Sequence, residues 1–237
     1  MTTEGKAILV TGSSRGIGRA LVEEALSRGA SRVYACSRKP LMHNDLRVTP
    51  HALDVTDEVQ IARAAQKVGS LDVLINNAGV FFPDNLNGPD ALQQHLAVNL
   101  FGTYSVTQAF LPLLVRSKGA IVNNVSIGAL APVPVAPAYM ASKAAVFNLT
   151  QSMRALLAGR GVAVHAVLTG PTDTDMVRGL DIPKASPESV ARAIFDGLEK
   201  GEEDIFPDPM SQTIAEGWRG GVAKALERQN AAFIPAA

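Results

Sequence analysis

The chain has 237 residues, 47% hydrophobic and 19% charged, which is long and apolar enough to bury the core of one large α/β domain. Lysine and arginine together number 22, as do aspartate and glutamate, so no excess of positive charge indicates a nucleic-acid partner or an anionic membrane surface. The single cysteine, Cys36, excludes an internal disulfide and is typical of a buried thiol in a reducing compartment.

Targeting and membrane signals are weak in this sequence. The first residues contain an acid and pass directly into a short apolar run, unlike a secretory signal, so we expect a cytoplasmic protein. The most apolar long segment noted, residues 127–138, contains three prolines and is too short to cross a bilayer. We therefore expect no membrane span, and the scattered histidines give no support for a metal site.

Short apolar runs alternate with segments of helical period along the chain. Because strands that alternate with helices form parallel sheets, we predict a Rossmann-type, doubly wound sheet of about seven strands with helices on both faces, as a single domain over residues 1–237. The first helix should end near Gly29, a suitable C-cap residue. The expected strands are 7–11, 32–36, 47–53, 71–76, 120–125, 162–168 and 204–206.

Two longer helical segments, residues 91–114 and 139–157, carry apolar or small residues on more than one face. One face of each should pack on the sheet. The second face packs either on a partner subunit or under loops of the same chain. The last segment, residues 207–237, has two short helical stretches of no evident role, in which Trp218 and Phe233 are candidates for contact with a neighbouring subunit.

A glycine-rich stretch, residues 11–18 (TGSSRGIG), follows an apolar run and opens a helical segment. Such a strand-to-helix turn lets backbone N–H groups approach a pyrophosphate. Gly12 allows the tight turn, Gly16 lets the backbone approach phosphate, and Gly18 lets the helix pack on the strand. A glycine turn without a ligand is the alternative for this loop taken alone.

Three further signals follow the glycine loop in order: residues 76–79 (NNAG), then Ser126, then Tyr139 with Lys143 one helical turn later. Each is weak alone. Together they resemble the short-chain dehydrogenase/reductase family from about Lys6 to at least Met176. The resemblance implies hydride transfer between a nicotinamide cofactor and a small-molecule substrate. The hydride adds to the carbonyl carbon of a ketone or aldehyde, or in reverse leaves the hydroxyl-bearing carbon of the alcohol.

The resemblance also implies roles for four catalytic residues. Tyr139 would donate the proton to the carbonyl oxygen, and since a free tyrosine has a pKa near ~10, we expect Lys143, with the oxidised nicotinamide, to lower it. Ser126 would hydrogen-bond the substrate oxygen. Asn99 matches the family asparagine that kinks its helix and anchors a water next to Lys143. Its alternative is a polar helix residue satisfied by backbone.

The end of the second predicted strand decides between the two nicotinamide cofactors. An acidic residue there would bind the ribose hydroxyls of NAD, but this chain has Ser37 followed by Arg38. Arg38 and Arg15 can clamp a 2′-phosphate, so we predict NADP(H), with two solvated surface charges as the alternative.

The downstream positions are less firmly assigned by the sequence. Asp54 either contacts the adenine, caps the next helix, or does both. Thr169 stands where the family has a proline before Gly170, and we expect a less rigid turn there. The residues that the resemblance implies for cofactor binding are Gly12, Ser14, Arg15, Gly16, Ile17, Gly18, Ser37, Arg38, Asp54, Val55, Asn77, Ala78, Gly79, Tyr139, Lys143, Gly170, Thr172 and Thr174.

The candidate substrate-facing residues are uncharged, and this pattern favours an apolar ketone, aldehyde or thioester-linked acyl group. They are residues 127–130, Val133, Val135, Phe81, Phe82 and Met176. We therefore expect an NADPH-dependent carbonyl reductase that forms a homo-oligomer, a dimer or tetramer. The alternatives are a 3-oxoacyl thioester reductase and, from another class, a non-catalytic NADP(H)-binding regulator. The intact set of Ser126, Tyr139 and Lys143 argues against the regulator.

Overall fold

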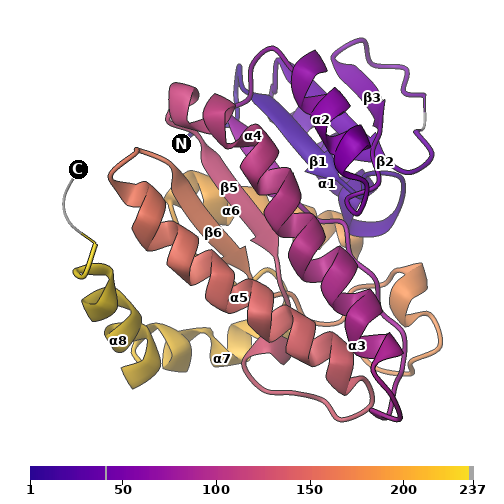
Figure 1. The fold of residues 1–237 in the computed structure, drawn as a ribbon, viewed down its shortest axis with the longest axis vertical. Coiled ribbons are helices and arrows are strands. Elements are labelled where there is room, and N and C mark those ends of the chain that lie inside the picture. Colours follow the sequence, from indigo (N-terminus) through magenta and orange to yellow (C-terminus); the bar gives the residue numbers. More distant parts are fainter. Residues whose placement is uncertain (41, 235–237) are drawn as a thin grey trace.

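The computed structural model describes residues 1–40 and 42–234 as a parallel sheet covered by helices on both faces (Figure 1). The sheet has seven strands in the order β3-β2-β1-β4-β5-β6-β7. All seven predicted strands are present, and no strand end is shifted by more than two residues, so the predicted fold is confirmed. The strands are β1 (Ala7–Thr11), β2 (Arg32–Ser37), β3 (Val48–Ala52), β4 (Val73–Asn76), β5 (Ala120–Asn124), β6 (Ala163–Val167) and β7 (Asp204–Ile205).

The strand order changes direction next to β1. The chain builds outward from β1 to β3, then crosses back to place β4 on the other side of β1. Successive side chains of a central strand point to opposite faces of the sheet, and in β1 Ile8, Leu9 and Val10 are all 0% exposed. The sheet is therefore buried on both faces. Ligands of such sheets bind beyond the carboxyl ends of the strands at this point of reversal.

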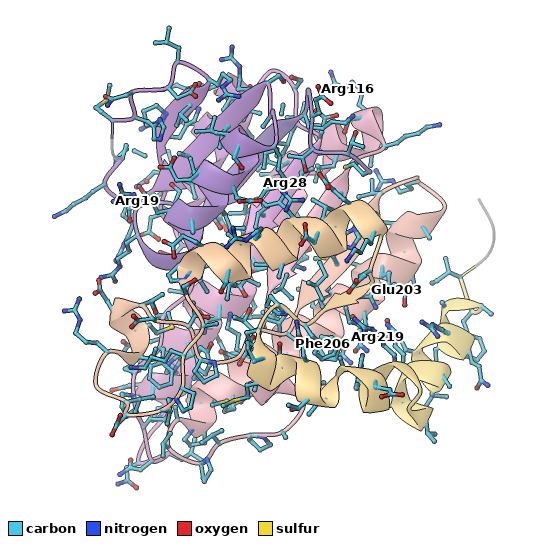
Figure 2. The ribbon with its side chains drawn as sticks, turned by 180° about the vertical axis from the view of Figure 1, so that it is seen from behind. Arg19, Arg28, Arg116, Glu203, Phe206 and Arg219 are labelled. Atoms are coloured by element: carbon cyan, nitrogen blue, oxygen red, sulfur yellow. The ribbon has the colours of Figure 1, made fainter. Side chains whose placement is uncertain are left out.

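Helices α1 (Gly16–Ser27) and α6 (Pro187–Lys200) contact each other on one face of the sheet (Figure 2). Arg28, at the C-terminal end of α1, pairs with Asp196 of α6 at 2.6 Å and Glu199 of α6 at 3.0 Å. Gly29 follows with a positive φ of 81°, as its predicted capping position requires. The other face carries α2 (Glu58–Lys67), α4 (Thr103–Ser117) and α5 (Pro137–Ala158).

The segment before α4 is one continuous helix with it. It consists of α3 (Asp90–His95) and a π-helical turn, η1 (Leu96–Gly102). Within the described residues, this 28-residue helix is long and apolar enough to cross a membrane, although the sequence analysis had considered only residues 127–138. It is weak evidence for a span, because the helix contacts α2, β4, β5 and α5 as a core helix does.

The two helical stretches near the C-terminus are α7 (Pro209–Arg219) and α8 (Val222–Ala231). Trp218, expected at a subunit contact, also packs within its own chain: its ring lies 5.4 Å from that of Phe147. Its indole N–H also donates to Asp204 at 2.7 Å, so the side chain is used within the chain. Phe233 is 83% exposed.

Candidate active site

The glycine loop between β1 and α1 forms one wall of the site, and its glycines are fixed by steric need. Gly12 and Gly16 have positive φ values of 67° and 54°, which other residues rarely adopt. A Cβ at Gly12 would lie 2.9 Å from the Cα of Ala78, and one at Gly18 would lie 2.1 Å from the Gly12 oxygen. Gly18 thus packs on the loop itself. A Cβ at Gly16 would lie 3.0 Å from Cγ2 of Thr174, so the segment after β6 lies on this loop.

The glycine loop is fastened to the ends of two neighbouring strands. The hydroxyl of Thr11 accepts hydrogen bonds from the backbone N–H groups of Asn77 and Ala78, both at 3.0 Å. The N–H and hydroxyl of Ser13 both donate to the Cys36 oxygen, at 3.1 and 3.0 Å. The loop therefore sits next to the end of β2, where the cofactor preference was predicted to be decided.

Two arginines lie at this junction. Arg38 is exposed just after β2, and the side chain of Arg15, on the loop, is 72% exposed. Ser37 donates its hydroxyl to the Lys39 oxygen at 2.9 Å, which shapes the turn that carries Arg38. Arg15 pairs with Asp175 at 2.9 Å, a contact that the sequence analysis did not anticipate. Ser14 is partly exposed beside Arg15, and Ile17 packs on the core under α1.

The predicted helix-cap role of Asp54 is wrong. The N-cap of α2 is Asp57, whose carboxylate accepts from the N–H groups of Val59 and Gln60 at 2.9 and 3.0 Å. Asp54 instead accepts from the N–H and hydroxyl of Thr56, at 2.9 and 2.7 Å, and closes the turn after β3. Both aspartates precede α2, and the sequence alone does not show which of them caps it.

Val55 follows Asp54 and is buried against the π-helical turn. A Cβ at Gly102 would lie 2.6 Å from Cγ2 of Val55. The predicted adenine-side residues therefore rest on the helix that carries Asn99.

Ser126, Tyr139 and Lys143 meet at the end of β5. Ser126 lies close enough to the Tyr139 hydroxyl to lower the pKa of that phenol. Lys143 lies one turn along α5 from Tyr139, with its Nζ 5.7 Å from the centre of the tyrosine ring. This Nζ donates to the backbone oxygen of Asn124 at 2.7 Å. The three residues predicted to be catalytic are therefore adjacent in space.

Asn99 lies behind this group, in the π-helical turn that accounts for its predicted kink. Its Nδ2 donates to the Val80 oxygen at 3.2 Å and to the Ser142 hydroxyl at 2.9 Å, and its Oδ1 accepts from the Val80 N–H at 2.9 Å. A Cβ at Gly79 would lie 3.3 Å from Asn99 Oδ1 and 3.8 Å from Lys143 Nζ. The Asn99 amide thus holds the chain after β4 close to Lys143. Its bonds to the Val80 backbone fit the alternative of a polar helix residue satisfied by backbone groups.

Burial governs the titration of the two α5 residues. It raises the pKa of Tyr139 to about 12, and the hydrogen bond from Ser126 offsets this only in part. Burial lowers the pKa of Lys143 to about 8. Burial therefore outweighs the lowering of the tyrosine pKa that the sequence predicts from Lys143, whose ammonium group donates to the Asn124 oxygen. Tyr139 therefore keeps its proton at neutral pH.

The loop after β6 is held by Asp208, a residue that was not predicted from the sequence. Asp208 is buried, and its Oδ2 accepts from the Gly170 N–H at 2.7 Å. The hydroxyl of Thr172 reaches the Gly170 oxygen, and that of Thr174 the Thr172 oxygen, both at 3.3 Å. Asp208 also caps α7 with Ser211, a capping-box pattern that could have been found in the sequence.

Aromatic side chains line the other side of Tyr139. Phe81 meets it edge to face with ring centres 5.0 Å apart, and His95 approaches it at 5.8 Å. Phe82 stacks on His95 at 4.0 Å. The Phe82 N–H donates to Nε2 of His95 at 3.3 Å, and Nδ1 of His95 bonds the Ala91 oxygen at 2.8 Å. His95, missed by the sequence analysis, is thus the support of this aromatic wall.

The sheet, the glycine loop and the group at the end of β5 are matched by known proteins. The family model for short chain dehydrogenases matches residues 6–184. The chain belongs to this family. A short chain dehydrogenase from Burkholderia cenocepacia J2315, solved in complex with NADP, is 38% identical in sequence, with a TM-score of 0.88 over 97% of this chain and 98% of that one.

Two curated short-chain dehydrogenase relatives are similar over most of this chain. Short chain dehydrogenase tazN of Aspergillus terreus is 36% identical over 87% of this chain, which spans about half, 49%, of that relative. The 3-oxoacyl-[acyl-carrier-protein] reductase FabG of Thermotoga maritima is 32% identical over 86% of this chain and 88% of its own length. Within the described part of this family member, no group of three or more His, Cys, Asp or Glu residues is arranged to hold a metal ion.

Proposed function

We propose that this protein is an NADP(H)-dependent reductase of an apolar ketone or aldehyde, which also oxidises the corresponding alcohol in reverse. The observation that carries this proposal is the contact of Tyr139 with Ser126 at the end of β5, with Lys143 one helical turn away. A protein that only sensed NADP(H) would not need a phenol beside a serine hydroxyl and a buried lysine. This arrangement argues against the regulator alternative.

The chain offers a suitable cradle for the cofactor. A Cβ at Gly12 or Gly16 would crowd Ala78 or Thr174, so glycine allows the tight turn that presents backbone N–H groups to a phosphate. The loop leads into the N-terminus of α1, whose N–H groups favour anions. Arg15 and Arg38 suit a 2′-phosphate, and the NADP complex of the Burkholderia relative supports this choice.

The reaction follows from the site residues. When bound, the reduced nicotinamide supplies a hydride to the carbonyl carbon of the substrate. The Ser126 hydroxyl orients the carbonyl oxygen, and the Tyr139 hydroxyl donates a proton to it as negative charge develops. The high pKa of Tyr139, about 12, keeps that proton available at neutral pH. Lys143, while protonated, stabilises the phenolate that remains.

The substrate class is proposed from the residues around Tyr139. Phe81 lies directly against it, Val133 and Val135 lie in the loop before α5, and Met176 lies in the turn after β6, with exposed fractions of 51%, 55% and 42%. These side chains favour an apolar group next to the carbonyl. The similarity to the Thermotoga maritima FabG supports a second candidate, a 3-oxoacyl thioester reductase with the same catalytic residues.

We also propose that the protein forms a homo-oligomer. Phe101 and Tyr104 are 59% and 46% exposed on the outer side of the η1–α4 helix, and Leu156 is 56% exposed on α5. These are the two helices whose second face the sequence left unassigned, and large exposed apolar side chains favour contact with another subunit.

The test follows absorbance of NADPH and, separately, NADH with an aryl ketone, an apolar aldehyde, a β-keto ester and an acetoacetyl thioester. We expect NADPH to be consumed with the ketone or aldehyde. Preference for the thioester would establish the second candidate instead. Tight NADPH binding without turnover of any of these would contradict both and favour the regulator.

A further inference from the structure

A chain of hydrogen bonds between side chains crosses the carboxyl ends of the central strands. The hydroxyl of Thr169, just after β6, donates to Oδ1 of Asn124 at 2.6 Å. Nδ2 of Asn124, at the end of β5, donates to Oδ1 of Asn77 at 3.0 Å. Nδ2 of Asn77, just after β4, donates to the backbone oxygens of Thr11 and Gly12 at 3.0 and 3.3 Å. The chain thus runs from the loop after β6 to the glycine loop.

The direction of this chain is fixed at its glycine-loop end. Backbone oxygens can only accept, so Asn77 must present its NH₂ group to Thr11 and Gly12. Its carbonyl oxygen then faces Asn124, which must donate, and the carbonyl oxygen of Asn124 is left facing Thr169. Only a side chain with a hydroxyl or N–H donor at position 169 completes the chain. A proline, which the family has at this position, has no such donor.

The same residues also hold two catalytic side chains in place. The backbone oxygen of Asn124 accepts from Nζ of Lys143 at 2.7 Å. The backbone oxygen of Thr169 accepts from the N–H of Ile127, next to Ser126, at 3.1 Å. The hydroxyl and the carbonyl of Thr169 thus both restrain the end of β5, a restraint that was not expected from the sequence. Thr169 is 7% exposed, so water competes little for these bonds.

We propose that Thr169 and Asn124 are positioning residues, which fix the glycine loop relative to Lys143 so that the two ends of the cofactor site keep one spacing. This inference rests on the proposed NADP(H) reductase function. The proposal gives the Thr169 hydroxyl a role at a position where the family has a proline. Loss of the Thr169 donor frees the Asn124 amide to rotate, and the Asn77 amide then loses its partner.

The experiment compares Thr169→Val, Thr169→Ser and Asn124→Asp in the full chain. Valine has the shape of threonine without the donor, and serine restores the donor. Aspartate accepts from Thr169 but places an acceptor against Oδ1 of Asn77. The matched control is Thr150→Val, which removes another buried threonine hydroxyl that accepts from an asparagine, Asn123, at 2.9 Å.

Two readouts need no turnover. The first is the Kd for NADPH, measured by titration of its fluorescence. We expect Thr169→Val and Asn124→Asp to weaken binding about 5- to 10-fold, as for one lost buried hydrogen bond, and Thr169→Ser to stay within about twofold of the wild type. The second is hydrogen–deuterium exchange in the protein alone, which should become faster at residues 77–80 in both variants but not in Thr150→Val, whose partner Asn123 bonds Asn76 outside this window.

The pH profile of reduction gives a third readout that a general loss of stability would not move. The pKa of Lys143 is lowered to about 8 by burial, and the carboxylate of Asn124→Asp should raise it. The alkaline limb of that variant should therefore shift to higher pH.

The outcomes separate the two proposals. If the wild type binds and oxidises NADPH while Thr169→Val matches it in Kd and exchange, the positioning role is overturned and the reductase function stands. Equal effects of Thr150→Val and Thr169→Val would also overturn it. A wild type that does not bind NADPH would overturn both proposals.

Discussion

The carboxylate of Asp175 lies 2.9 Å from the guanidinium group of Arg15 and thereby joins the segment after β6 to the glycine loop. Asp175 also pairs with Arg178. Arg15 is one of two arginines proposed to bind the 2′-phosphate, so the Asp175 carboxylate and that phosphate compete for the same guanidinium group.

This competition predicts the effect of Asp175→Asn. Removal of the carboxylate should strengthen NADPH binding about two- to fivefold, and NADH binding should stay unchanged because NADH carries no 2′-phosphate. The pair is exposed, so we expect little change in thermal stability. Titration of the two cofactors against wild type and variant measures this. A parallel gain for NADH would show that the carboxylate acts on another part of the site.

Arg38→Asp tests the cofactor preference itself. A carboxylate at the end of β2 repels a 2′-phosphate and can accept from ribose hydroxyls. We expect the ratio of kcat/KM for NADPH over NADH to fall by about 100-fold, the loss of one or two charge-assisted hydrogen bonds. Arg160→Asp, in a turn remote from β2, serves as a control for the change in net charge. An unchanged ratio in Arg38→Asp would contradict the assignment of NADP(H).

Tyr139→Phe removes the proposed proton donor and keeps the ring that Phe81 contacts. The reduction rate should fall by about 100- to 10,000-fold, with NADPH affinity close to that of the wild type. Single-turnover kinetics at saturating NADPH check this. Wild-type rates in the variant would exclude the mechanism proposed above.

The pH dependence of reduction follows from the two α5 residues. Tyr139, with a pKa of about 12, stays protonated across the neutral range. Lys143 has its pKa lowered from 10.5 to about 8, so its charge is present below pH 8 and is lost above it. We expect kcat for reduction to be level between pH 6 and 8 and to fall above that range. A profile that rises through pH 8 would show that the charge of Lys143 is not required.

His95 makes stability depend on acid. Its Nε2 accepts from the Phe82 N–H, which requires an unprotonated nitrogen, and burial lowers its pKa below 6.5 while Lys143 lowers it further and Asp84 raises it. The unfolded chain therefore takes up a proton before the folded one does, and stability falls as pH drops below about 6.5. Burial lowers the pKa values of His51 and His165 as well.

His95→Phe isolates this contribution. The ring stack on Phe82 is kept, while the acceptor for the Phe82 N–H is lost, which should cost about 1–3 kcal/mol at neutral pH. The drop in Tm between pH 7 and 5 should be smaller than in the wild type, and KM for an apolar ketone should rise more than kcat falls. Thermal unfolding across this pH range measures the first effect. A drop in Tm as steep as that of the wild type would assign the acid sensitivity to the other histidines.

The strands and the glycine loop were predictable because their signals are local. Burial on both faces makes the central strands, such as β1, continuous apolar runs, and the positive φ angles at Gly12 and Gly16 require glycine at those positions. Ser126, Tyr139 and Lys143 could likewise be identified from their order and spacing along the chain. These features depend on neighbours in sequence.

The contacts that the sequence did not reveal depend on register between distant segments. Thr169 meets Asn124 because the pairing of β5 with β6 sets Asn124 opposite Val167, two residues earlier. No periodicity contains that information. Spacing along the helix likewise places Lys143 near the Tyr139 ring, but only packing shows that burial raises the pKa of that tyrosine.

Asp204 is 3% exposed and binds side chains from three helices: Arg154 of α5 and Lys224 of α8, both at 2.7 Å, and Trp218 of α7. Removal of one partner from a buried ion pair leaves a charge without compensation, so these helices cannot separate one at a time without a large penalty. We therefore expect them to unfold as a single cooperative unit. Because α5 also carries Tyr139 and Lys143, damage near the C-terminus is transmitted to the catalytic helix, although no residue of α8 touches the reacting atoms within the described structure.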